Sequence, residues 1–106
     1  MAKNKKVIIS CAVTGAIHTP SMSEYLPVTA DEVIEHSLAA HEAGAAVLHL
    51  HARDEIDGHP TQDPEEFQKF LPTIQNSCDA VINITTGGGP QMSVEERMKP
   101  AMHFKP

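Results

Sequence analysis

Two histidines, His49 and His51, stand two residues apart at the end of an apolar segment. In an extended strand residues i and i+2 point to the same face, so both imidazoles are expected to project together. Two neutral imidazoles form half of a zinc site, since a catalytic zinc ion takes about three protein ligands and keeps one open position. A carboxylate is a common third ligand, which the sequence does not assign to a residue. The spacing fits equally well two histidines that are hydrogen-bonded at a strand edge.

Charged residues follow this histidine pair directly, as Arg53 and Asp54. One interpretation is an ordinary ion pair between the two side chains. The other is that they orient a metal ligand or an anionic substrate. The sequence leaves both interpretations open.

A second chemical feature is the run Thr85-Thr86-Gly87-Gly88-Gly89, which follows a later apolar segment. Glycines let the backbone approach a ligand, and successive N–H groups bind anions. The run matches neither the phosphate-binding loop of nucleotide hydrolases nor the glycine pattern that binds dinucleotides. It therefore favours a carboxylate or a small phosphate over a nucleotide. The alternative is a tight turn that only requires glycine.

Other polar or reactive side chains carry weaker signals. Thr14 closes the first apolar segment and is expected to line the same site, whereas Cys11 is expected in the core. His36 and His41 are five residues apart on a predicted helix, a spacing that does not favour a shared metal ion. The histidines predicted to lie at the surface are His18, His36, His41, His59 and His103.

Strands and helices are expected to alternate along the chain. Short apolar or β-branched runs predict buried strands over residues 6–12, 45–51 and 80–86. Residues with helix-capping character predict helices that begin after Thr29, Asp63 and Ser93, each with a glutamate three residues later. Gly44 is expected to end the first helix, and Pro72 to kink or shorten the second. Residues 52–62, with the turn pair Asp57-Gly58, are predicted to form a loop.

This order of elements predicts an α/β fold with a parallel sheet and right-handed crossovers. The segments after the strands are long and polar, and the turns before them are short. That asymmetry is typical of a (β/α)8 TIM barrel, whose chemistry lies on the loops at the carboxyl ends of its strands. The three units fit a small layered domain, or the first part of a larger one.

Composition excludes several classes of function. The 106 residues include 8 lysines and arginines against 14 aspartates and glutamates, which gives a net charge of −6. Nucleic acids and anionic membranes favour clustered positive charge, so neither is an expected partner. The two cysteines do not suggest a disulfide framework. No apolar run is long enough for a signal peptide or a membrane span, which favours the cytoplasm.

Four segments resemble the β-keto acid cleavage enzymes, a family that includes the 3-keto-5-aminohexanoate cleavage enzyme. They are TGA at Gly15, LPVTADEV, AGAAVLHLHARD with the following DGHPTQDPE, and NITTGGG. The resemblance runs through nearly the whole chain, in order.

The resemblance implies a fold, a reaction and site residues. The family members are (β/α)8 barrels that bind a divalent metal ion, usually zinc, and form homo-oligomers. They react a β-keto acid with acetyl-CoA and give acetoacetate and a new CoA ester. His49 and His51 match the metal histidines, Thr85 matches a hydroxyl that contacts substrate, and Gly87 and Gly88 match the adjoining glycine loop.

The sequence also departs from the family pattern. A whole barrel takes about 250 residues, so residues 1–106 correspond to an N-terminal portion with the first three β/α units. The third metal ligand and the catalytic acid and base are expected beyond residue 106, and the fragment alone is expected to be inactive. The stretch 15–18 lacks the glutamate with which the aminohexanoate enzyme binds its substrate amine, so an uncharged or differently charged β-keto acid fits as well as one that carries an amine.

Two alternatives to an enzyme remain. The chain fits a non-catalytic α/β module that pairs with a partner, because a sheet with an open edge needs cover. It also fits a small α/β domain with structural histidines and a glycine loop that binds phosphate.

Overall fold

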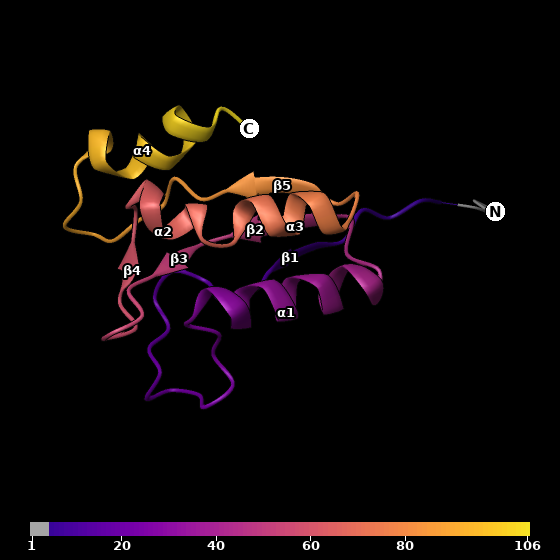
Figure 1. Ribbon diagram of the computed structural model, residues 1–106, viewed down its shortest axis with the longest axis horizontal. Coiled ribbons are helices and arrows are strands. Elements are labelled where there is room, and N and C mark those ends of the chain that lie inside the picture. The colour runs from indigo at the N-terminus through magenta and orange to yellow at the C-terminus, as the bar shows by residue number, and fades with distance from the viewer. Residues whose placement is uncertain (1–4) are drawn as a thin grey trace.

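A computed structural model describes residues 5–106 of the chain (Figure 1). Strands and helices alternate, as the sequence predicts. In chain order the elements are β1 (Ser10–Ala12), α1 (Ala30–Glu42), β2 (Val47–Leu50), β3 (Ala52–Arg53), β4 (Pro60–Thr61), α2 (Pro64–Gln68), α3 (Leu71–Ser77), β5 (Val81–Ile84) and α4 (Val94–Phe104).

The main sheet is parallel and has the strand order β1-β2-β5, with β2 in the centre. Its register aligns Ala12 with His49 and His49 with Asn83. The predicted parallel α/β arrangement is therefore confirmed. The prediction of a plain loop over residues 52–62 is wrong, because β3 and β4 pair antiparallel in a short hairpin. The hairpin turns at Gly58, whose φ of +76° is a conformation that favours glycine.

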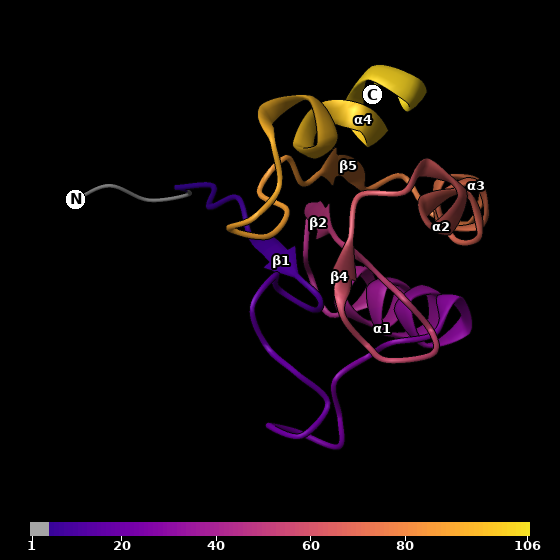
Figure 2. The ribbon, with the colours of Figure 1, turned by 90° about the vertical axis from the view of Figure 1, so that its left-hand side faces the viewer.

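One face of the sheet carries the core. Leu48 and Leu50 of β2 are both 0% exposed, and Ile84 of β5 shares their face. Figure 2 shows α1 and the pair α2–α3 on this same side of the sheet. Each fully buried side chain of this size contributes about 1.5–3 kcal/mol through the hydrophobic effect. The buried apolar residues are Val33, Ala45, Leu48, Leu50, Ala52, Phe67, Phe70, Leu71, Ile74 and Ile84.

No helix covers the other face of the sheet within the described residues. The paired residues Ala12, His49 and Asn83 lie on this face and are half-buried or exposed. The first strand is shorter than the predicted run 6–12, and Val7 is 80% exposed rather than buried. Val7 is exposed because β1 lies at the edge of the sheet, where no described segment covers the apolar residues that precede the strand.

The predicted helix starts are confirmed by their caps. The side chain of Thr29 accepts a hydrogen bond from the N–H of Glu32 at 3.2 Å, and that of Ser93 accepts one from Glu96 at 3.2 Å. Asp63 accepts from Glu65 at 2.9 Å. These bonds satisfy N–H groups that the first turn of a helix leaves free.

Helix ends also follow the local sequence. Pro72 divides the second predicted helix, so that α2 ends at Gln68 and α3 begins at Leu71. Gly44 follows α1 with a φ of +125°.

Within residues 5–106, no helix has both the length and the apolar character required to cross a bilayer.

Candidate active site

The two histidines lie side by side at the carboxyl end of β2. The ring centroids of His49 and His51 are 4.8 Å apart, and the ring planes are inclined by 84°. Their side chains therefore project together, as the spacing of two residues predicts. In a parallel sheet this end of the central strand is where ligands bind.

A side chain on the neighbouring strand orients His49. Asn83 of β5 is its register partner, and the His49 Nδ1 hydrogen bonds to the Asn83 Oδ1. Because an amide oxygen only accepts, Nδ1 carries the proton and Nε2 keeps a free lone pair. Metal-binding histidines commonly donate their second N–H in this way. Asn83 was not predicted from the sequence, although Asn83 and Thr85, at the end of β5 and just after it, have the same spacing of two residues as the histidines.

His51 is held in its neutral form. It is 7% exposed, and its Nδ1 is buried without a hydrogen-bond partner among the described residues. Burial lowers the pKa of His51 to about 4, and electrostatic interactions with the neighbouring His49 and Arg53 act in the same direction. An imidazole that is neutral at pH 7 releases no proton when it binds a metal ion.

The lowered pKa of His51 predicts a loss of stability in acid. Its folded pKa of about 4 lies below the ordinary value of 6.5, so stability is fully present above pH 6.5 and is lost as the pH falls toward 4. The full difference amounts to about 3 kcal/mol. Urea unfolding of the metal-free complete protein at pH 7 and pH 4.5 measures this decline. His51→Gln should remove it, whereas the exposed control His36→Gln should not, and equal declines in all three proteins would contradict the assignment.

Thr85 lies at the end of β5 next to the histidines. It is 3% exposed, and its N–H donates to the carbonyl oxygen of Leu50 at 3.0 Å. Its Oγ1 accepts from the N–H of Gly87 at 3.0 Å, which orders the first turn of the glycine loop. The hydroxyl keeps its own hydrogen to donate.

Gly88 occupies a position that no other residue fits without strain. Its φ is +56°, and an added Cβ would lie 2.7 Å from the Met92 Sδ and 3.0 Å from the Arg97 Cγ. The N–H of the next residue, Gly89, donates to the same sulfur at 3.3 Å. The glycine loop is therefore packed closely against the start of α4.

Two further side chains hold this loop, and neither was predicted from the sequence. The Gln62 Nε2 donates to the carbonyl oxygens of Thr85 at 3.2 Å and Arg97 at 2.8 Å. The Arg97 Nε donates to the carbonyl oxygen of Thr86 at 3.0 Å. These contacts join residues distant in the sequence, so neither local pattern nor spacing could indicate them.

The ion pair considered for Arg53 and Asp54 is wrong. Arg53 is 3% exposed and donates to the carbonyl oxygens of Gly58 at 2.7 Å and Gly15 at 3.1 Å. Asp54 accepts instead from the N–H of Ile56 at 2.8 Å. Thr14 is buried beside Gly15, at the end of β1.

The other histidines take no part in this site, and one is not a plain surface residue. His41 is half-buried, and its ring nitrogens bond to the carbonyl oxygen of Ala45 at 2.7 Å and to Asp79 at 3.0 Å. Cys11 is half-buried and packs against the core, as expected. Residues 5–106 contain no group of three or more histidine, cysteine or carboxylate side chains that could hold a metal ion. His49 and His51 thus provide two ligands and not a complete set.

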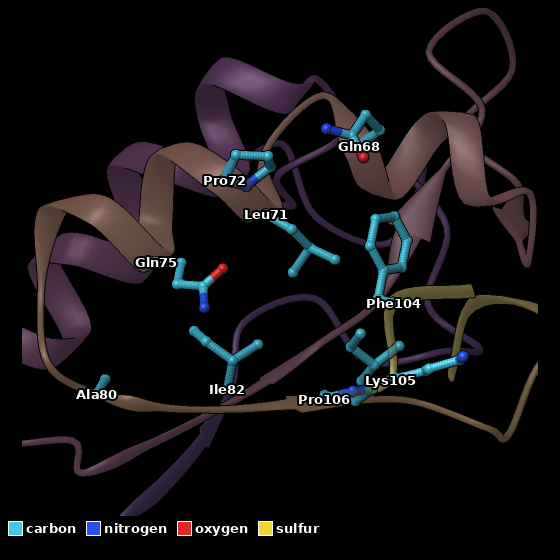
Figure 3. Close-up of a pocket in the computed structure, with 10 residues that line it drawn as sticks. Gln68, Leu71, Pro72, Gln75, Ala80, Ile82, Phe104, Lys105 and Pro106 are labelled. Atoms are coloured by element: carbon cyan, nitrogen blue, oxygen red, sulfur yellow. The ribbon is translucent and has the colours of Figure 1, made fainter. Parts of the chain in front are cut away.

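A separate cavity of about 410 Å³ lies between α3, β5 and the end of α4 (Figure 3). Leu71, Ile82 and Phe104 line it. Ile82 alternates with Asn83 along β5, so the cavity lies on the helix-covered face and not beside the histidines. Its lining has no histidine, cysteine or carboxylate side chain, and it is not part of the candidate active site.

The fold and site define an α/β protein whose polar groups meet at the carboxyl edge of a parallel sheet. Comparison with known families identifies the group more closely. The chain belongs to the beta-keto acid cleavage enzyme family, which matches residues 6–106. The resemblance seen in the four sequence segments is therefore confirmed.

Curated relatives are similar over most of the chain. A 3,5-dioxohexanoate:acetyl-CoA acetone transferase of Paraburkholderia graminis is 66% identical over all 106 residues, which cover 34% of that protein. A 3-keto-5-aminohexanoate cleavage enzyme of Acetoanaerobium sticklandii is 40% identical over 91% of the chain and 35% of its own length. A 3-dehydrocarnitine:acetyl-CoA trimethylamine transferase of Rhizobium meliloti is 39% identical over 84% of the chain and 30% of its own length. The chain thus spans about a third of the length of these relatives.

Proposed function

We propose that these residues belong to an enzyme that reacts a β-keto acid with acetyl-CoA and gives acetoacetate and a new CoA ester. Family membership over residues 6–106 is the observation that carries this proposal. The names of the relatives support it, because two of them specify acetyl-CoA as the second substrate.

In this proposal residues 1–106 form the N-terminal portion of a single (β/α)8 barrel, with its first three β/α units. The uncovered face of the sheet supports a barrel. His49 and Asn83 project from this face, while the opposite face is buried under α1 and α3. In a closed barrel such a face lines the interior, and further strands pair with both open edges.

His49 and His51 are proposed to hold a divalent metal ion, with zinc as the candidate. The observations that support this are the adjacent rings, the free lone pair on the His49 Nε2 and the neutral state of His51. The third ligand then comes from outside residues 5–106. A metal ion bound there supplies Lewis-acid polarisation of the keto oxygen of the substrate.

The protein's own residues bind and orient the substrate. Thr85, Gly87 and Gly88 are proposed to hold the substrate carboxylate, with the Thr85 hydroxyl as a donor. Gln62 fixes the backbone of Thr85, so this donor is held in place before substrate binds. The catalytic acid and base are proposed to lie beyond residue 106.

The substrate is proposed to lack a positive charge at the end remote from the carboxylate. The relative at 66% identity is named for 3,5-dioxohexanoate, which carries no amine. The stretch 15–18 contains no acidic residue that could pair with an ammonium group. An unpaired charge in a binding site is strongly disfavoured, so the site is expected to select against an amine.

The test is an assay of the complete protein with acetyl-CoA and either 3,5-dioxohexanoate or 3-keto-5-aminohexanoate. We expect kcat/KM to be higher for 3,5-dioxohexanoate by about 100-fold or more. A preference for the amine would contradict the proposed substrate class. An absence of turnover with every β-keto acid tried would contradict the proposed function itself.

A further inference from the structure

A buried arginine joins two loops at the edge of the sheet where the histidines lie. The Arg53 Nη1 donates to the carbonyl oxygen of Gly58, at the turn of the β3–β4 hairpin. Its Nη2 donates to the carbonyl oxygen of Gly15, in the loop that follows β1. One side chain therefore fixes two segments that are distant in the sequence.

The environment of Arg53 argues against a purely stabilising role. A guanidinium group is costly to bury unless its charge is paired. In the described part of the chain Arg53 forms no ion pair with a carboxylate, and its Nε is buried without an acceptor. An apolar side chain of similar length would avoid the cost of burying the charge, but the carbonyl oxygens of Gly15 and Gly58 would then lose these donors. What the charged group adds is therefore the link between the two segments.

Two more contacts join the same loop to the same hairpin. A Cβ on Gly58 would lie 2.5 Å from the Pro20 Cγ, so the hairpin turn packs against the middle of the loop without space to spare. The Glu55 Oε1 accepts from the N–H of Ala30 at 2.9 Å, where the loop ends and α1 begins. The loop over residues 14–28 is thus held near both ends and in the middle, and Figure 1 shows it at the same end of the sheet as the hairpin.

The strand order places this loop beside the candidate active site. Because β2 lies between β1 and β5, the histidines at its end are flanked by the loop after β1 and by the glycine loop after β5. In the register of the sheet Ala12, two residues before Thr14, is the partner of His49. The start of the loop held by Arg53 therefore flanks the histidines on one side, and the glycine loop flanks them on the other.

We propose that Arg53 is a positioning residue that fixes the loop 14–28 as a wall of the substrate site, and so sets the affinity for the β-keto acid. This inference rests on the proposed function. The guanidinium of Arg53 acts through the carbonyl oxygens of Gly15 and Gly58 and need not touch the substrate. Substrate binding is expected to depend on it more strongly than the rate of bond cleavage.

The test uses the complete protein with Arg53→Gln and Arg53→Lys. For Arg53→Gln we expect the KM for the β-keto acid to rise about tenfold or more, with kcat within about threefold and metal content unchanged. Arg53→Lys should recover part of the lost affinity, because an ammonium group donates to one of the two carbonyls. Lys6→Gln, which removes an exposed positive charge, is the matched control and should behave as the wild type.

Gly58→Ala is a second variant that disturbs the same junction and leaves Arg53 intact. It should raise the same KM, because its Cβ would displace Pro20. An unchanged KM in Arg53→Gln and Gly58→Ala, or a fall in kcat at constant KM, would overturn the inference.

Amide hydrogen exchange tests the role of Arg53 independently of any enzymatic activity. Residues 14–28 should exchange faster in Arg53→Gln than in the wild type, and at an intermediate rate in Arg53→Lys, without any substrate present. If the wild type turns over no β-keto acid, the proposed function fails, and the exchange rates still decide whether Arg53 holds the loop. Equal exchange in all three proteins would overturn the role of Arg53.

Discussion

Replacing His49 and His51 together by alanine is expected to remove the bound metal ion from the complete protein and to lower kcat/KM by about 1,000-fold or more. The reason is that one strand supplies both imidazoles, and a single remaining ligand binds zinc poorly. Metal analysis of the purified variant measures the first effect, and a steady-state assay measures the second.

The matched control for this variant is the double change His36→Ala and His59→Ala. Both histidines are exposed and lie outside the site, so two imidazoles are lost without a change in the donor set. The control should keep its metal content and activity. Stoichiometric zinc in the His49 and His51 variant would show that the ion is held elsewhere.

Gly88→Ala is expected to have the second largest effect. The new Cβ would lie 2.7 Å from the Met92 Sδ and 3.0 Å from the Arg97 Cγ, at a φ of +56° that strains any residue with a Cβ, so either these side chains or the glycine loop has to shift. We expect a loss of stability of about 2 kcal/mol or more. A displacement of about 1 Å at Thr85 and Gly87 is expected to reduce kcat/KM by about 100-fold.

Gly44→Ala separates backbone strain from the steric clash. Gly44 also has a positive φ, +125°, but nothing lies within 4 Å of the position that a Cβ would occupy there. This control is expected to lose about 1 kcal/mol of stability and to keep full activity. Denaturant unfolding and kinetics on both variants make the comparison, and similar activity in the two proteins would argue against a role for the glycine loop.

Features of the structure that depend on neighbouring residues could be predicted from the sequence. Thr29, Asp63 and Ser93 cap helices as their side-chain chemistry indicates, because a cap involves residues only two or three positions apart. His49 and His51 lie together because side chains in a strand alternate with a period of two.

Features that depend on tertiary contacts could not be predicted in this way. Asn83 orients His49 through the register of two parallel strands, and Gln62 reaches Thr85 from a hairpin that was expected to be a loop. Of the two interpretations that the sequence left open for Arg53 and Asp54, the ion pair does not form, because distant carbonyl groups accept from the guanidinium.

The first apolar segment shows a different limit of sequence reasoning. Hydrophobic pattern alone predicts burial over residues 6–12, yet Val7 and Ile8 are 80% and 76% exposed. Burial requires a neighbouring surface as well as an apolar side chain. Their exposure fits the proposal that further strands of a barrel cover this edge.

The most direct test of the proposed metal site is a crystal structure of the complete protein, with anomalous diffraction recorded on both sides of the zinc absorption edge. We expect one zinc peak within about 2.0–2.1 Å of a ring nitrogen of both His49 and His51. A zinc peak at other residues, or no peak at all, together with His49 and His51 rings that face packed side chains, would contradict the proposed metal site.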